Sequence, residues 1–271
     1  MIKNYLTPKE ITDYTIESGY DKVNRKTHIV FLLAIMAGVY ISLGAFASSV
    51  AAHDIMNKGV ARLVTGAIFP VGLMFIVING GDLFTGNILI AMSTYKKRTT
   101  IPNFVKNLSI VLVGNFIGAV LIAYLVASSG LLTMSDNRFG AYVIKTAVYK
   151  NNLPLKEIFS LAILCNLFVC AGIWMMYSAK DIAGKVLAGF FPLLAFAISG
   201  SEHVVANMYY VPLALFSKAN LDYIHGAHVS AEQLSHLTWQ YFLVHNVIPV
   251  TLGNTIGGLF IATMYYLIYK K

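Results

Sequence analysis

Long runs of apolar residues, separated by shorter polar stretches, divide this chain into six segments. The runs cover residues 29–50, 60–91, 104–127, 158–177, 186–216 and 241–269. A membrane-spanning helix needs about 20 predominantly apolar residues. The pattern therefore predicts an all-α integral membrane protein with six transmembrane segments.

The second and fifth runs are long enough for more than one helix, and each carries the same polar pattern near its middle. The pattern is Gly80, Asp82 and Asn87 in one run and Gly200, Glu202 and Asn207 in the other. Glycine tolerates positive φ, and short polar side chains cap helices, so both runs are predicted to be broken into half-helices. Unpaired backbone survives at membrane depth only where it is buried in protein or lines a cavity.

Asp82 and Glu202 are the only acidic residues inside the apolar runs. A carboxylate at membrane depth is costly and therefore indicates a functional site. A structural alternative stays open, in which both acids cap the helices that follow the breaks.

Further matches indicate an internal repeat. Phe69-Pro70 in the second run corresponds to Phe191-Pro192 in the fifth, and Gly114-Asn115-x-x-Gly118 in the third corresponds to Gly253-Asn254-x-x-Gly257 in the sixth. Because each half has three segments, the second half must run inverted through the bilayer, and the binding site of such a plan lies at the midplane. We expect one channel domain over 29–271, with repeats at 29–128 and 157–271, preceded by a surface helix within 1–28.

Composition supports a membrane protein, and the distribution of basic residues indicates how the chain is oriented in the membrane. The chain is 57% hydrophobic and 12% charged, with a mean hydropathy of +0.68. If both termini are cytoplasmic, thirteen of the 20 basic residues lie on that side, which favours this orientation. The net charge of +8 follows the membrane flanks and gives no reason to expect nucleic acid as a partner.

Four strings carry a resemblance to the formate/nitrite transporter family. They are Gly81-Asp82-Leu83-Phe84-Thr85, Asn166-Leu167-x-Val169-Cys170, Ser199-Gly200-x-Glu202-His203-x-x-Ala206-Asn207-Met208 and Ile248-Pro249-Val250-Thr251-x-Gly253-Asn254-x-x-Gly257-Gly258. The resemblance implies an aquaporin-like protomer, a homopentamer with one pore per protomer, and passage of small monovalent anions through a prokaryotic cytoplasmic membrane. The chain looks most like the hydrosulfide-channel branch of that family.

The same resemblance assigns roles to particular positions. Thr85 and His203 match the pore centre, and Lys150 matches an external basic residue. The constriction-lining positions are Phe69, Leu73, Leu83, Phe84, Val169 and Phe196, and Asn166 joins the structural positions of the two breaks. Gly86-Asn87 departs from the Ser-Thr pair of the formate channels, so substrate preference cannot be copied from them.

The chemistry of these residues suggests a mechanism. Half-helices that meet at the midplane direct backbone N–H groups toward an anion. Apolar constrictions penalise a bare charge, so a neutral species crosses more cheaply. Histidine has an unperturbed pKa near physiological pH, and we hypothesise that His203 hydrogen-bonds the anion and lends it a proton. A buried structural histidine is the alternative.

The predicted function is a channel for small weak-acid anions, with hydrosulfide first and formate and nitrite as related substrates. A proton-coupled formate or nitrite transporter and an aquaporin-like channel for neutral solutes are the alternatives. No enzyme activity or cofactor is expected: a hydrolase using Glu202 and His203 would need a nucleophile or metal in range, and no phosphate-binding glycine motif is present. No metal is expected, although a metal is an alternative to a solvated polar loop at His225, His228 and His236. The helix predicted over 8–26 is either a lid on the cytoplasmic mouth or a fixed interfacial anchor.

Overall fold

The computed structural model describes residues 4–269, in which the regular secondary structure is helical apart from one isolated β-bridge between Tyr5 and Ala179, and turns and loops join the helices. Four helices cross the molecule without a break in their apolar stretch: α2 (Thr27–Ala52), α7 (Ile101–Ser128), α9 (Leu155–Ser178) and α15 (Ile248–Tyr269). Six helical stretches in the described part of the chain are long and apolar enough to span a membrane. The predicted all-α membrane fold with six segments is confirmed.

The second segment is broken as predicted. It consists of α3 (Lys58–Ile68), α4 (Val71–Asn79), and, after an extended stretch, the short α5 (Phe84–Asn87), a 3-10 turn over Ile88–Ile90 and α6 (Ala91–Tyr95). Gly80 ends α4 at φ 94°, a conformation that L side chains rarely adopt. Pro70 adds an interruption between α3 and α4 that the sequence pattern did not predict.

The fifth segment is broken in the same way. It consists of α10 (Ile182–Ser199) and α11 (Val204–Ser217), and Gly200 between them lies in the left-handed region at φ 73°. The sixth segment has a feature that the sequence pattern did not predict: α14 (Trp239–Tyr241) and a π-helical stretch over Phe242–Val247 precede α15. A π turn shifts the register of the side chains that follow it.

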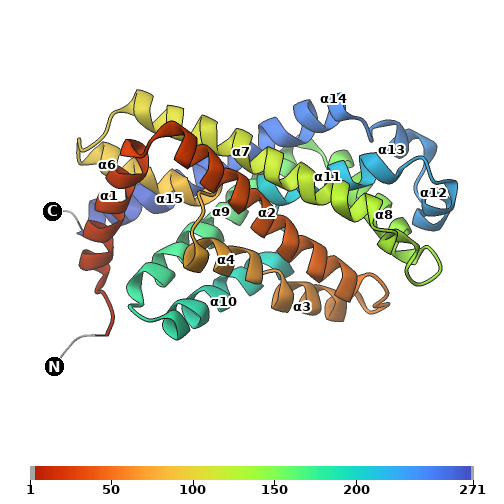
Figure 1. The fold of residues 1–271 in the computed structure, drawn as a ribbon, viewed down its shortest axis with the longest axis horizontal. Helices are drawn as coiled ribbons and strands as arrows, with labels where there is room; N and C mark the ends of the chain where they lie inside the picture. Colours follow the sequence, from red (N-terminus) through yellow and green to blue (C-terminus); the bar gives the residue numbers. More distant parts are fainter. Residues whose placement is uncertain (1–3, 270–271) are drawn as a thin grey trace.

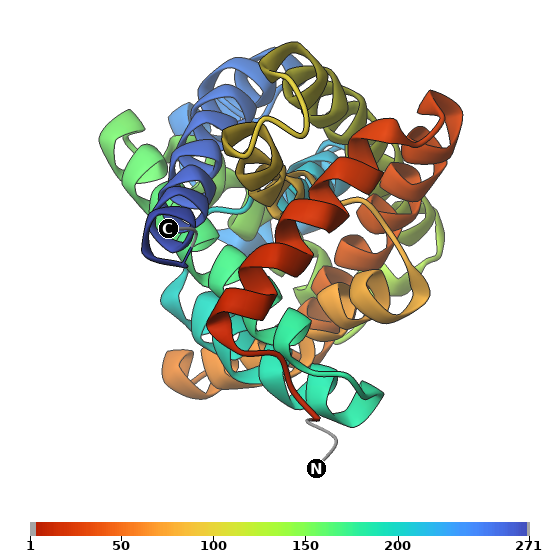
Figure 2. The same ribbon diagram turned by 90° about the vertical axis from the view of Figure 1, so that its left-hand side faces the viewer.

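Shorter helices cover the two ends of the bundle. Figure 1 shows α1 (Pro8–Asn24) and both described chain ends at one end, which we call the terminal side. At the other end, the opposite side, lie α8 (Arg138–Asn152), α12 (Leu221–Ala227) and α13 (Ala231–Ser235). In Figure 2, α1 runs across the terminal end of the bundle. A Thr7–Glu10 capping box begins α1.

Candidate functional site

The two broken segments meet at a buried contact between Thr85 and His203. Thr85 lies in the first turn of α5, and His203 is the N-cap residue of α11. Thr85 Oγ1 lies 3.0 Å from His203 Nε2, and both residues are at most 2% exposed. The sequence predicted these two residues together at the centre of the pore, and the fold brings them into contact.

The other ring nitrogen of His203 is engaged by the backbone. The backbone N–H of Ala206 donates to His203 Nδ1 at 3.2 Å. Since Nδ1 accepts this hydrogen bond, the proton of a neutral imidazole is on Nε2. His203 Nε2–H is therefore the donor in the contact with Thr85 Oγ1.

The carbonyl group of Thr85 is held by α9. Asn166 Nδ2 donates to Thr85 O at 3.2 Å, and Cys170 Sγ donates to the same oxygen at 3.4 Å. Asn166 Nδ2 also donates to Asn254 O at 2.7 Å. Asn166, predicted as a structural residue of the breaks, thus connects both halves of the molecule behind the Thr85–His203 contact.

Asparagines on the neighbouring helices, and not the two acids, cap the half-helices. Phe84 N donates to Asn115 Oδ1 at 2.9 Å, and Val204 N donates to Asn254 Oδ1 at 3.0 Å. The side-chain nitrogens of Asn115 and Asn254 in turn donate to the carbonyl oxygens of Asp82 and Glu202. The expectation that the carboxylates of Asp82 and Glu202 are caps is therefore wrong.

The Asp82 carboxylate binds cations from the terminal side. Lys22 Nζ lies 3.1 Å from Asp82 Oδ1, and Arg25 Nη1 lies 3.3 Å from Asp82 Oδ2. Lys22 also donates to Asn87 Oδ1 at 2.5 Å, and Asn87 Nδ2 donates to Asn107 Oδ1 at 3.0 Å. We call Lys22, Arg25, Asp82, Asn87 and Asn107 the terminal cluster. Burial alone would lower the pKa of Lys22, but the Asp82 charge, Tyr177 and the hydrogen bond to Asp82 together raise that pKa above its usual 10.5.

A matching set of residues surrounds Glu202. Lys150 Nζ donates to Glu202 Oε1 at 2.8 Å, and Asn207 Nδ2 donates to Glu202 Oε2 at 2.6 Å and to Asn246 Oδ1 at 2.8 Å. We call Lys150, Glu202, Asn207 and Asn246 the opposite cluster. Lys150, expected as a basic residue at the external entrance, has a side chain that is 13% exposed and paired with the buried carboxylate of Glu202.

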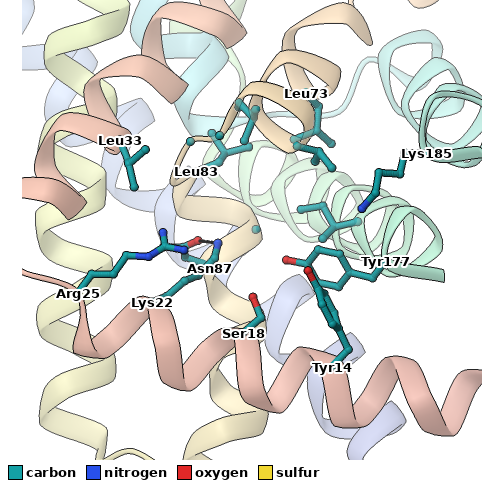
Figure 3. A pocket seen from close by; sticks show the side chains of 16 residues that line it. Tyr14, Ser18, Lys22, Arg25, Leu33, Leu73, Leu83, Asn87, Tyr177 and Lys185 are labelled. Atoms are coloured by element: carbon teal, nitrogen blue, oxygen red, sulfur yellow. Dashed lines mark hydrogen bonds between the residues drawn. The ribbon is translucent and has the colours of Figure 1, made fainter. Parts of the chain in front are cut away.

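A cavity lies on each side of the Thr85–His203 contact. The terminal vestibule, of about 280 Å³, is shown in Figure 3. It lies beside the first break and is lined by Tyr14, Ser18, Lys22, Arg25, Leu33, Leu73, Ile76, Val77, Gly80, Gly81, Leu83, Gly86, Asn87, Ile173, Tyr177 and Lys185. The opposite vestibule, of about 260 Å³, is lined by Arg62, Thr65, Phe69, Tyr142, Thr146, Tyr149, Lys150, Phe196, Ala197, Gly200, Ser201, Glu202, His203, Ala206 and Tyr210.

The predicted constriction residues divide between the two vestibules. Leu73 and Leu83 line the terminal one. Phe69 and Phe196 line the opposite one, with their rings edge to face at 5.6 Å. Phe84 and Val169 are also buried, at 3% and 2% exposure, but line neither vestibule.

Sequence reasoning missed the partners of the two acids. Lys22 and Arg25 lie in the surface helix, outside the apolar runs from which the site was predicted. Asn107 and Asn246 left a signal, because each precedes its repeated Gly-Asn motif by the same spacing. A search for polar residues at matched distances from Asn115 and Asn254 would have found both.

Comparisons with known proteins agree with this arrangement. Residues 9–268 match the formate/nitrite transporter family. The formate channel FocA of Escherichia coli K12 is 35% identical over 98% of this chain and 95% of its own length, and FocA of Haemophilus influenzae is 33% identical over 93% and 90%.

Solved structures are similar too. A pentameric formate channel with formate bound superposes with a TM-score of 0.79 at 32% identity, covering 90% of this chain and 98% of its own. An FNT family ion channel gives a TM-score of 0.82 at 27% identity, covering 95% and 98%. This chain, a multi-pass membrane protein and not an enzyme, belongs to the formate/nitrite transporter family.

Proposed function

We propose that this protein is a channel for small monovalent weak-acid anions, with formate as the first expected substrate. The observation that carries the proposal is the neutral His203, whose Nε2–H reaches Thr85 between two vestibules with apolar walls. An anion that replaces the Thr85 hydroxyl as acceptor receives a hydrogen bond from His203 between the two vestibules. The formate channels among the relatives support formate as the substrate class.

The apolar residues on both sides of this contact decide which species crosses. Leu73 and Leu83 lie on one side, and Phe69 and Phe196 lie on the other. An isolated ion in such surroundings carries a heavy desolvation penalty, which the neutral acid avoids. Weak acids therefore cross faster than the anion of a strong acid of similar size.

The role proposed for His203 is that of a hydrogen-bond donor. Lending a proton from the doubly protonated ring would need a proton on Nδ1, which would sacrifice the hydrogen bond from Ala206 N–H. Lending the Nε2 proton from the neutral ring would leave an imidazolate in an apolar site. The substrate is therefore proposed to take its proton from a hydronium ion of the solution, through the acid–base equilibrium of the weak acid before it passes the apolar residues.

The proposal includes assembly and orientation. The pentameric formate channel that this chain resembles supports a homopentamer with one pore per protomer. The excess of basic residues on the terminal side supports cytoplasmic termini in a prokaryotic inner membrane. The channel domain over 29–271, with inverted repeats at 29–128 and 157–271, is part of the same proposal. Hydrosulfide and nitrite stay predicted further substrates.

Flux into proteoliposomes tests the function. Formate, nitrite and hydrosulfide should cross faster than chloride, and lowering the pH toward their pKa values should increase their flux. Chloride flux equal to formate flux at every pH would contradict neutral transit. No flux of any weak acid would contradict the channel itself.

Two variants of His203 test the central contact. Asn can keep both the cap to Ala206 N–H and a donor, so His203→Asn should keep part of the flux and the wild-type pH profile. Phe removes donor and cap, so His203→Phe should lower weak-acid flux further at equal amounts of assembled protein. A changed pH profile in His203→Asn would support proton lending instead.

A further inference from the structure

The terminal vestibule is lined by a lysine, Lys185, that belongs to neither cluster. Lys22 and Arg25 both bind the Asp82 carboxylate. Lys185, in the first turns of α10, lines the same cavity and has no ion-pair or hydrogen-bond partner for its Nζ among residues 4–269. Figure 3 shows its amine directed into the cavity from the side away from Lys22. A half-buried ammonium facing a cavity attracts an anion.

Hydroxyl groups from two other helices face the same space. Tyr14 and Ser18 lie on α1, and Tyr177 lies near the end of α9. The two tyrosine rings pack edge to face with their centroids 4.9 Å apart, and Figure 3 shows both hydroxyls turned toward the middle of the cavity. Burial raises the pKa of Tyr14, which keeps its hydroxyl protonated as a donor.

These groups differ from the pore centre in what they can bind. An ammonium and a hydroxyl on different walls of the cavity can each donate a hydrogen bond to one oxygen of a carboxylate. Such charge-assisted hydrogen bonds are stronger than those between neutral groups. A single-atom anion offers no second oxygen. The cavity of about 280 Å³ leaves room for a small carboxylate together with water.

We propose that Lys185, with the hydroxyls of Tyr14, Ser18 and Tyr177, forms an anion site that holds a small monocarboxylate at the terminal end of the pore. The choice of a carboxylate rests on the proposed function. The site increases the local concentration of substrate beside the apolar wall formed by Leu73 and Leu83, and so sets the concentration at which flux from the terminal side saturates.

Binding is measured without transport. Addition of the purified protein in detergent should broaden the 13C resonance of labelled formate. Because Lys185→Gln removes a charge-assisted hydrogen bond, it should raise the dissociation constant for formate about 5- to 10-fold. Lys185→Arg keeps the charge and should bind formate about as tightly as wild type. Tyr177→Phe should weaken binding less than Lys185→Gln. Lys96→Gln is the matched control, because Lys96 is exposed on the same side and lies outside the cavity.

Flux is then measured from each side separately, with spheroplasts and inverted vesicles of one host strain. Lys185→Gln should raise the half-saturating formate concentration only for flux that starts on the terminal side, and should leave the maximal flux near wild type. Equal saturation in wild type and Lys185→Gln, or an equal shift in Lys96→Gln, would overturn the site.

The two measurements separate the site from the channel. Formate broadening that Lys185→Gln abolishes, in a protein that carries no formate, would support the site and contradict the proposed function. Normal formate flux with broadening that Lys185→Gln leaves unchanged would overturn the site alone.

Discussion

The glycines at the two breaks have different backbone requirements. Gly80 has φ 94° and ψ 134°, a combination essentially restricted to glycine, whereas Gly200 has φ 73° and ψ 23°, which asparagine also adopts. No heavy atom lies within 4 Å of a Cβ built on Gly80. The need for glycine at position 80 therefore comes from the backbone conformation and not from lack of space.

Substitutions at Gly80 and Gly200 should destabilise the protein by different amounts. Gly80→Ala should destabilise the protein by about 1–3 kcal/mol, the cost of holding an L residue in such a conformation. Gly200→Asn should cost less, because asparagine tolerates the left-handed region. The melting temperatures of the two variants in detergent, each compared with wild type, check this. Equal losses at both positions would contradict it.

Gly86 is one of the two positions at which the chain departs from the Ser-Thr pair of the formate channels, and the space for a side chain there is limited. A Cβ at this position would lie 2.6 Å from Cδ1 of Ile173 on α9. Both residues line the terminal vestibule. A side chain at position 86 must therefore push Ile173 aside.

A double substitution tests this contact. Gly86→Ser should reduce formate flux and destabilise the protein by about 1–3 kcal/mol, as overpacking does. Adding Ile173→Val, which removes the Cδ1 atom, should restore most of both losses, while Ile173→Val alone should stay near wild type. Strictly additive effects in this cycle would show that the two residues do not interfere.

At the scale of elements, α1 is attached to the pore by the terminal cluster. Lys22 and Arg25 reach Asp82 in the first break, and the Ser93 hydroxyl of α6 donates to the Ile16 carbonyl of α1. The Lys22 side chain is 16% exposed and that of Arg25 is 40% exposed. Since screening weakens exposed pairs, Lys22 contributes more to the attachment than Arg25.

Removal of Lys22 should therefore loosen α1. Deleting one partner of a buried ion pair typically costs about 3–5 kcal/mol when the other charge is left uncompensated. Arg25 still pairs with Asp82 in Lys22→Gln, so the loss should be smaller than this range. Lys22→Gln should increase hydrogen exchange in α1 strongly, and Arg25→Gln should increase it less. If α1 in Lys22→Gln exchanges as slowly as in wild type, other contacts hold the helix.

The attachment should also depend on pH in one direction. The pKa of Lys22 is raised in the folded protein, so its contribution is fully present below the ordinary lysine value of 10.5 and is lost only as the pH rises through the higher folded value. Protection of α1, corrected for intrinsic exchange rates, should therefore stay constant between about pH 6 and 9. A fall within that range would show that another group controls the attachment.

At the scale of the whole molecule, each protomer contains both vestibules and its own Thr85–His203 contact. Five copies assembled as proposed would carry five independent pores. Mixed pentamers of wild-type and His203→Phe protomers should therefore conduct formate in proportion to the wild-type fraction. Flux that falls more steeply than this fraction would indicate that the pores are coupled.

Apolar periodicity and the doubled Gly-acid-Asn pattern were enough to predict the membrane fold and both breaks, because these features depend on local sequence. The partners of Asp82 and Glu202 could not be predicted in this way. Lys22 and Lys150 come from α1 and α8, whose positions over the breaks depend on tertiary packing. The π-helical stretch that places Asn246 beside Asn207 likewise has no local signal.

The division of the two clusters between the halves has a consequence for the origin of the pore. Lys22, Asp82, Asn87, Asn107 and Asn115 all precede α8, and their counterparts Lys150, Glu202, Asn207, Asn246 and Asn254 all lie in α8 or beyond. The chain before α8 therefore supplies one cluster, and the chain from α8 onward supplies the other. Two antiparallel copies of a single ancestral half would already have enclosed both clusters. His203 corresponds in this repeat to Leu83, so the contact with Thr85 is a feature that the two halves do not share.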